Sequence, residues 1–281
     1  MEQHGMLREF SDSDLIPSAK VLEEVVELCR SIFFPGFYGR SSVNKNILKY
    51  NIGVTVERVY TLLTSQIAAG LYLNGNTSED CDSQNAIYDR AAEIASRVIE
   101  KLPSIKEVLA TDVEAAYKGD PAATSYSEVV SCYPIIKVLS NYRLAHILFK
   151  EDVPLIPRML TEMAHSETGI DIHPGAEIGT HFTVDHGTGV VIGATCVIGN
   201  NVKLYQGVTL GAKSFPLAPD GTPIKGIPRH PILKDNVIVY SNATILGRVT
   251  VGEGAVVGGN IWVTEDVPAG ARLTQYRSAN H

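Results

Sequence analysis

The sequence lacks several features that define whole classes of protein. Its cysteines lie singly at positions 29, 81, 132 and 196, without a CxxC pair or a short disulfide-type spacing. Reduced thiols in a reducing compartment are therefore expected. No apolar run approaches the roughly 20 residues that cross a bilayer, and Met1 to Phe10 has no signal-peptide core. These absences predict a cytoplasmic protein that does not use a membrane.

Positive charge is also scarce. The formal net charge is -7, from 24 Lys and Arg against 31 Asp and Glu. Nucleic-acid binding needs a clustered excess of Lys and Arg, so this balance argues against a nucleic-acid partner. It still permits an anionic ligand at one local basic site. With 281 residues, the chain can bury one large core or two smaller ones.

Residues 1–168 show the spacing of amphipathic helices, and we expect an all-α domain there. Ser18 caps the first predicted helix, which stops at Pro35-Gly36, and a second begins near Thr55 and ends at Asn74-Gly75-Asn76. The remaining predicted helices are a third around Ile87 to Val98, a fourth from Ser104 to Lys118, a fifth around Ile135 to Phe149 with Pro134 in its first turn, and a short sixth that opens at Pro154 and Pro157 and fades near His165.

Beyond Gly169 the apolar residues recur every six positions. One register is Ile172, Ile178, Val184, Val190, Cys196, Val202 and Val208, and a second is Val237, Ala243, Val249, Ala255, Ile261 and Val267. This period predicts a parallel β-helix of hexapeptide repeats over residues 169–281, in which residues about eighteen apart stack on one another. A β-sandwich would instead show strict alternation and irregular strand spacing.

One segment breaks the repeat. Residues 213–231, from Lys213 to Pro231, are rich in Pro and Gly and do not fit the six-residue period. We expect a loop that protrudes from the rigid β-helix, and long loops of this kind are more often functional than decorative. This loop ends in Arg229-His230-Pro231.

Four histidines, at positions 173, 181, 186 and 230, fall within the predicted β-helix. They could be ordinary surface or core residues, metal ligands, or groups that transfer protons. The segment Asp185-His186-Gly187-Thr188-Gly189 favours the last reading, because glycine lets a backbone approach a ligand closely. His186 also lies six residues before Ile192 on an apolar track, where a polar side chain needs a reason.

Three ordered motifs, Asp171-Ile172-His173-Pro174, Asp185-His186-x-Thr188-Gly189 and Arg229-His230-Pro231, resemble serine acetyltransferases. Upstream, Gly119-Asp120-Pro121-Ala122 and Tyr142-Arg143-Leu144-Ala145-His146 resemble the helical domain of that family, so the resemblance runs from about Ala116 to Pro268. It implies transfer of the acetyl group of acetyl-CoA to the hydroxyl of L-serine, the first step of cysteine biosynthesis from serine. It also implies a left-handed β-helix, against the usual hand of parallel crossovers.

The resemblance assigns two residues to the chemistry. His186 matches the general base that the serine hydroxyl needs, and imidazoles that titrate near neutrality suit this task. Asp171 matches the carboxylate that orients this imidazole, as the acid of a hydrolase triad does. The hydroxyl would then attack the thioester directly, without an acyl-enzyme. Consistent with this, the chain has no G-x-S-x-G motif, and Cys196 sits at a core repeat position.

Other residues match the serine site. Asp120, beside Pro121, and Asp185 match the pair that receives the substrate ammonium. Arg229 suits the substrate carboxylate through two parallel hydrogen bonds, and His230 matches a second anchor. Without the resemblance, the sequence favours Asp120 as the end of a helix. Arg229 is then equally consistent with a solvated loop charge, and Asp171 is consistent with the cap of a turn.

The resemblance also implies an acetyl-CoA site along a groove between neighbouring β-helices, lined by Gly211, Ser241 and Asn242. The family pattern there is small and glycine-rich, whereas this chain has Tyr240 before Ser241. No permanently bound cofactor and no metal are expected. Because β-helices of this type assemble side by side, we expect a homotrimer or a dimer of trimers.

The chain departs from the family at its tail, Tyr276-Arg277-Ser278-Ala279-Asn280-His281, which lacks a terminal isoleucine. A tight complex with O-acetylserine sulfhydrylase is therefore not expected, and feedback inhibition by cysteine stays open. Three other functions compete. They are an acetyltransferase for another small acceptor such as homoserine or a sugar, a metal-dependent hydratase that uses three histidines, and a scaffold without catalysis.

Overall fold

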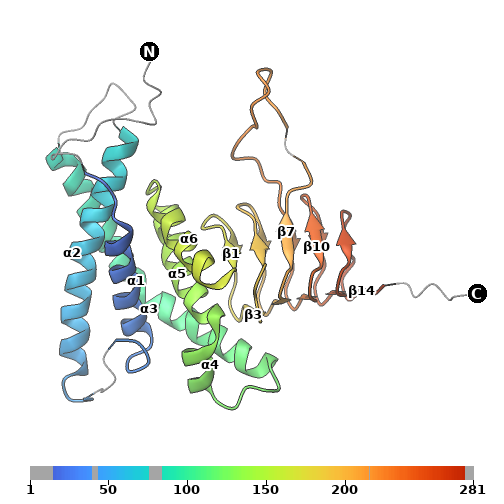
Figure 1. Ribbon diagram of the computed structural model, residues 1–281, viewed down its shortest axis with the longest axis horizontal. Coiled ribbons are helices and arrows are strands. Elements are labelled where there is room, and N and C mark those ends of the chain that lie inside the picture. Colours follow the sequence, from blue (N-terminus) through green and yellow to red (C-terminus); the bar gives the residue numbers. More distant parts are fainter. Residues whose placement is uncertain (1–14, 40–43, 76–83, 215, 276–281) are drawn as a thin grey trace, which may run out of the picture.

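The computed structural model describes residues 15–39, 44–75, 84–214 and 216–275. A helical half precedes a parallel β-helix of about five coils, which confirms the expected fold class (Figure 1). The expectation for the tail from Tyr276 to His281 lies outside the described residues, as does that for Cys81. Cys29, Cys132 and Cys196 are free thiols. None of the described helices is long and apolar enough to cross a membrane.

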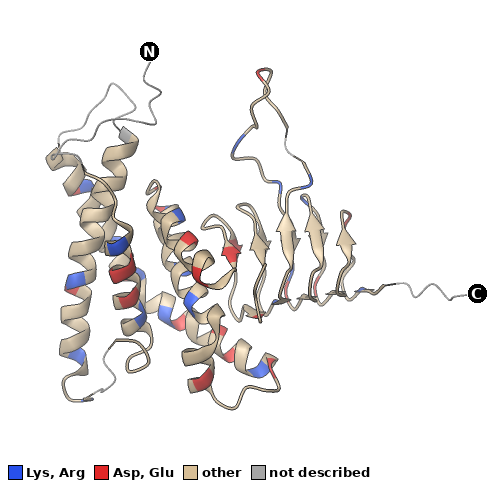
Figure 2. Cartoon of the chain, viewed as in Figure 1, with Lys and Arg blue, Asp and Glu red and all other residues tan. Residues whose placement is uncertain are grey.

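The helical half contains α1 (Ala19–Phe33), α2 (Leu48–Gly75), α3 (Gln84–Gly119), α4 (Tyr126–Cys132), α5 (Pro134–Lys150) and α6 (Ile156–Thr168). The Ser18 hydroxyl accepts a hydrogen bond from the Val21 amide, so the predicted cap of α1 is confirmed. Pro134 stands in the first turn of α5, as predicted. Along these helices acidic and basic residues are interspersed (Figure 2).

Two helix predictions were wrong. The third and fourth predicted helices are one, because α3 runs through Pro103. Val98, Leu102, Ile105 and Leu109 are buried on one face on both sides of the proline, so packing outweighs the lost hydrogen bond. In the same way, α2 starts well before Thr55. The turns of α2 before Val59 contain no buried side chain, so the sequence has no periodic apolar pattern there that would predict a helix.

The β-helix has three parallel sheets. Each of the first four coils adds one strand to each sheet in turn, and the last coil adds strands to the first and third sheets only. The first sheet holds β1 (Asp171–Ile172), β4 (Val191–Ile192), β7 (Thr209–Gly211), β10 (Thr244–Leu246) and β13 (Trp262–Val263). The second holds β2 (Glu177–Ile178), β5 (Val197–Ile198), β8 (Ile232–Leu233) and β11 (Thr250–Val251). The third holds β3 (Thr183–Asp185), β6 (Lys203–Tyr205), β9 (Ile238–Val239), β12 (Val256–Val257) and β14 (Arg272–Leu273). The result is a three-sided prism with an apolar core.

The first coil is longer than the period predicts. Ile172 pairs with Ile192, 20 residues on, whereas Ile192 pairs with Leu210, 18 residues on. The two extra residues lie at the corner between β3 and β4, around His186. The buried side chains of the prism stack in columns, and Val190 belongs to a second column, two positions upstream of the column of Ile192. The predicted six-residue register therefore passes from one column to the other at this corner. Consequently, the interpretation of His186 as a polar residue on an apolar track was wrong.

Helix α5 attaches the helical half to the first coil, together with α3 and α6. Tyr142, Arg143 and His146 each donate to a main-chain carbonyl oxygen, at Ala176 (2.6 Å), Gly179 (2.8 Å) and Pro174 (2.7 Å) respectively. The motif from Tyr142 to His146, which resembles part of the family's helical domain, therefore attaches that domain to the β-helix.

The segment 213–231 projects from the prism between β7 and β8 (Figure 1). Near its tip, Leu217 and Pro223 form an antiparallel bridge, and the Asp220 carboxylate accepts from the Thr222 amide (2.9 Å). Its returning arm brings Arg229 and His230 back to the prism.

Candidate functional site

His186 lies at the corner between the third and first sheets. Asp185 ends β3, and the next residues turn with left-handed backbone angles, φ being 58° at His186 and 90° at Gly187. Gly187 is required here, since a Cβ would lie 2.4 Å from Ile170 Cδ1. The extra length of this corner pushes the imidazole outward, where its side chain is 74% exposed. Its Nε2 lies 3.8 Å from Oδ1 of Asp185.

Asp120 lies against the same corner, at the junction between α3 and α4. Its Oδ2 accepts from the Tyr133 hydroxyl (2.5 Å), and its Oδ1 accepts from the Ala122 amide (2.8 Å). These two hydrogen bonds, the first above all, hold the pKa of Asp120 below its ordinary value. Asp120, Tyr133 and Asp185 line one small cleft, and Pro121 is in the turn beside them. The structure therefore brings together three predicted residues, Asp120, Asp185 and His186.

Sequence reasoning missed Lys203, which belongs to this cleft. Its ammonium lies 3.0 Å from Oδ2 of Asp185 and donates to the Gly119 carbonyl (2.7 Å). The pattern gave little signal, because Lys203 occupies an outward-facing strand position where a solvated charge is ordinary. Tyr133 was missed too, since nothing in its local sequence indicates that it reaches Asp120.

A second group of predicted residues surrounds His230, at the edge between the first and second sheets. His230 is only 7% exposed, and its Nδ1 accepts from the Thr195 amide (3.1 Å), which places the ring proton on Nε2. The ring covers Gly193, where a Cβ would lie 2.0 Å from Cδ2 of His230. Burial, then the charges of Arg229 and Arg248, lower the pKa of His230, so the ring stays neutral.

Arg229 and His173 flank His230. The Arg229 amide donates to the Thr195 hydroxyl (2.9 Å), and both Arg229 and His173 line a groove beneath the returning arm of segment 213–231. Burial, helped by the charge of Arg158, lowers the pKa of His173 to about 4. Arg248 lines the same groove, and its Nη1 donates to the His230 carbonyl oxygen (3.0 Å). This edge therefore offers two guanidinium groups and two neutral imidazoles.

The two groups occupy different edges of one prism. His186 follows the third sheet, whereas His230 precedes the second, and no hydrogen bond or ion pair between described residues joins the groups. The histidines at 173, 181 and 186 likewise follow strands of three different sheets, so one chain does not gather a three-histidine metal site.

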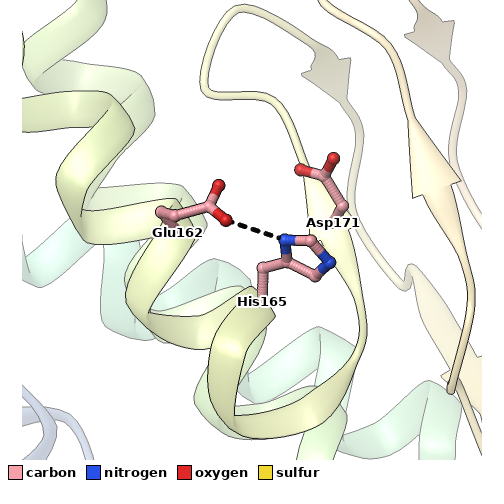
Figure 3. A group of neighbouring side chains, drawn as sticks. All are labelled: Glu162, His165 and Asp171. Carbon is pink, nitrogen blue, oxygen red and sulfur yellow. Dashed lines mark hydrogen bonds and ion pairs between the residues drawn. The ribbon is translucent and has the colours of Figure 1, made fainter.

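Asp171 lies at the start of β1, and its carboxylate faces α6. Its Oδ1 is 3.7 Å from Nη1 of Arg158, and Glu162 and His165 lie beside it (Figure 3). The Nδ1 of His165 is hydrogen-bonded to Glu162 Oε1 (3.0 Å), and donor atoms of these three residues lie within 4.8 Å of one another. Partly exposed groups of this kind are common without an ion. In the described part of the chain, the carboxylate that His186 reaches is that of Asp185, not Asp171.

The predicted acetyl-CoA residues divide between the two edges. Gly211 ends β7 on the His230 side. Ser241 and Asn242 instead lie where the chain turns from the third sheet to the first, two coils after the corresponding turn at His186. Tyr240, the departure noticed in the sequence, stacks on Tyr205 with ring centroids 4.9 Å apart.

No protein-family model matches the chain. Among curated proteins, it is 47% identical over 261 residues to a plasmid-encoded serine acetyltransferase of Synechococcus elongatus, covering 92% of this chain and 82% of that protein. It is 43% identical over 161 residues to the serine acetyltransferase of Bacillus subtilis, covering 57% of this chain and 70% of that one. Among solved structures, serine acetyltransferase 1 of Entamoeba histolytica, in complex with L-cysteine, superposes with a TM-score of 0.77 and 31% identity, over 92% and 97% of the two chains. The left-handed β-helix of such structures confirms the expected winding.

Proposed function

The chain belongs to the serine acetyltransferase family, and on that premise we propose how its residues transfer an acetyl group from acetyl-CoA to L-serine. The products are O-acetyl-L-serine and CoA. One observation carries the mechanism: an exposed imidazole, His186, stands beside two carboxylates, Asp120 and Asp185, at a single corner of the prism.

His186 acts as the general base. The serine hydroxyl gives its proton to the imidazole as its oxygen attacks the thioester carbonyl carbon, and the carbon–sulfur bond then breaks. The protonated imidazole returns the proton to the leaving sulfur, so that CoA departs as the thiol. Direct attack is supported by Cys196, since burial raises the pKa of its thiol to about 12 and leaves it un-ionised.

Serine is recognised as a zwitterion. Asp120 and Asp185, with Pro121 beside them, receive the ammonium, and Arg229 grips the carboxylate while the neutral His230 anchors it from the same edge. Because these groups occupy different edges of one chain, a second copy supplies Arg229 and His230. This supports a homotrimer in which each site lies between neighbours, with acetyl-CoA running past Gly211 of one copy and Ser241 and Asn242 of the other.

The residue that orients His186 is either Asp171 or Asp185. We assign it to Asp171, whose carboxylate must then turn away from Arg158 when substrate binds. On this assignment, Asp171→Asn lowers kcat by about 10²- to 10⁴-fold with little change in the KM for serine. Asp185→Asn chiefly raises that KM. If the two variants exchange these effects, the orienting carboxylate is Asp185.

The test of the function is thiol release from acetyl-CoA with a panel of acceptors. We expect release with L-serine and a rate at least tenfold lower with homoserine or sugars, because a longer or uncharged acceptor cannot engage both carboxylates and the guanidinium. Faster thiol release with another acceptor would mean that this acceptor, and not serine, is the substrate. Loss of activity on treatment with a chelator would point to the metal-dependent alternative.

Two variants test the site itself. His186→Ala should lower kcat by about 10²- to 10⁴-fold while the protein remains folded. A folded variant with a near-native rate would remove His186 from its role. Arg229→Ala should raise the KM for serine much more than that for acetyl-CoA, and equal effects on both would contradict a carboxylate-binding role.

A further inference from the structure

Lys203 is a largely enclosed cation of the proposed serine site. It lies on the outer face of β6, its side chain is 15% exposed, and its ammonium has three neighbours. These are Oδ2 of Asp185 (3.0 Å), the main-chain oxygen of Gly119 (2.7 Å) and the ring of Tyr205, whose centroid is 4.4 Å away. The stem packs against Gly119 at the end of α3, where an added Cβ would be in ordinary van der Waals contact with Lys203 Cδ, at 3.6 Å.

The contact with Gly119 gives this lysine a mechanical role. Gly119 is the last residue of α3, and Asp120 follows it directly. Asp120 belongs to the helical half, whereas Asp185 belongs to the β-helix, so their spacing depends on how the two halves meet. Lys203 joins the two sides of the cleft through one ammonium, which binds the carboxylate on one side and the end of α3 on the other.

The charges of the cleft lead to the same role. Asp120 and Asp185 carry two negative charges, and Lys203 contributes one positive charge within the same cleft. The remainder is one negative charge, which a single substrate ammonium neutralises. Without Lys203, two carboxylates would face each other across the cleft and repel, and the helix end would lose its polar tie to β6.

We propose that Lys203 is a positioning residue for the acceptor, because it holds Asp120 and Asp185 at the spacing that binds one ammonium group. This inference rests on the proposed serine site. Lys203 does not touch the reacting atoms. Its removal should therefore weaken serine binding and leave the handling of acetyl-CoA intact.

The experiment uses the full-length protein and begins with the wild type, which must release thiol from acetyl-CoA in the presence of L-serine. If it does not, the proposed function fails, whatever Lys203 does. Lys203→Ala is then compared with Lys234→Ala, which removes an exposed lysine of the same β-helix. The KM values for serine and for acetyl-CoA are measured separately in each variant.

For Lys203→Ala we expect the KM for serine to rise about 10- to 100-fold, the range that corresponds to losing hydrogen bonds to charged groups. The KM for acetyl-CoA should change by less than about twofold, like both constants in Lys234→Ala. An unchanged or lower KM for serine, in an active protein, would overturn the inference alone. A lower value would mean that Lys203 competes with the substrate ammonium.

Chemical rescue separates positioning from general stabilisation. The alanine variant lacks three side-chain carbons and the ammonium of lysine, and propylammonium supplies the same number of carbons and the same charged group, so added propylammonium should restore much of the serine affinity. Tetramethylammonium has the charge but cannot donate hydrogen bonds, and it should not rescue. Rescue by both ions or by neither would contradict the proposed tie. Should the alanine variant fail to fold, Lys203→Met keeps the packing and Lys203→Arg keeps the charge. The methionine variant should then show the raised KM for serine, and the arginine variant a smaller rise.

Discussion

Replacing Arg143 by alanine should destabilise the protein strongly, because it leaves a buried charge without a partner. The Arg143 guanidinium grips the Asp112 carboxylate with two hydrogen bonds (2.8 and 3.0 Å), and the Asp112 side chain is completely buried. Asp112 also accepts from the Phe182 amide (3.0 Å). This pair therefore links α3 and α5 to the first coil of the β-helix.

The magnitude follows from what remains after the change. Removing one partner of a buried ion pair costs about 3–5 kcal/mol, a large part of the roughly 5–15 kcal/mol that stabilises a folded domain. The double variant Arg143→Met with Asp112→Asn leaves no unpaired charge, and its asparagine oxygen still accepts from Phe182. It should be less destabilised than Arg143→Ala, although it carries more substitutions.

The free energies of unfolding of the single and the double variant are measured by urea unfolding, followed by the circular dichroism of the helices. All samples have the same protein concentration, because subunit assembly also contributes to stability. Burial already raises the pKa of Asp112, and losing Arg143 raises it further. The folded variant then binds a proton that the unfolded chain releases. The loss in free energy of unfolding relative to the wild type should therefore become smaller as the pH falls. A double variant less stable than Arg143→Ala would refute this reasoning.

Three further predictions concern the site. The folded chain keeps the pKa of His173 at about 4, against 6.5 when unfolded, so the free energy of unfolding should fall as the pH drops from 6.5 to about 4. His173→Asn should flatten this part of the pH titration, and an unchanged slope would exclude His173. Gly193→Ala should displace the His230 ring and raise the KM for serine about 10- to 100-fold. An unchanged KM for serine would contradict the role of His230. Tyr133→Phe removes the hydrogen bond that lowers the pKa of Asp120, so the Asp120 carboxyl, followed by its carbon resonance in an NMR titration, should titrate at higher pH in the variant. An unchanged titration of Asp120 would contradict this.

Much of the fold was predictable because helices and β-helix coils each impose their own spacing on buried apolar residues. The turn from helical spacing to a six-residue repeat marks the change from helices to β-helix near Gly169, and Ser18 and Pro134 act locally as their chemistry dictates. The slip at the His186 corner was not predictable by counting. Both columns of the prism are apolar, so a run that changes from one to the other at Val190 still looks regular.

The candidate site was predictable only in part. Asp185 and His186 are neighbours in sequence, and Asp120 joins them through the meeting of the two halves of the chain. That meeting depends on contacts between residues far apart, such as Lys203 with Gly119, which no local pattern contains. For the same reason, the orientation of Asp171 toward Arg158 could not be read from its motif.

The most direct test of a site shared between copies is complementation between two inactive variants. His186→Ala disables one edge of the prism and His230→Ala the other, so each variant alone should have little activity. Co-expressed and purified together, they should form mixed assemblies in which some interfaces pair an intact His186 with an intact His230. Random mixing predicts about a quarter of the wild-type rate. A mixture no more active than its separate components would contradict the account.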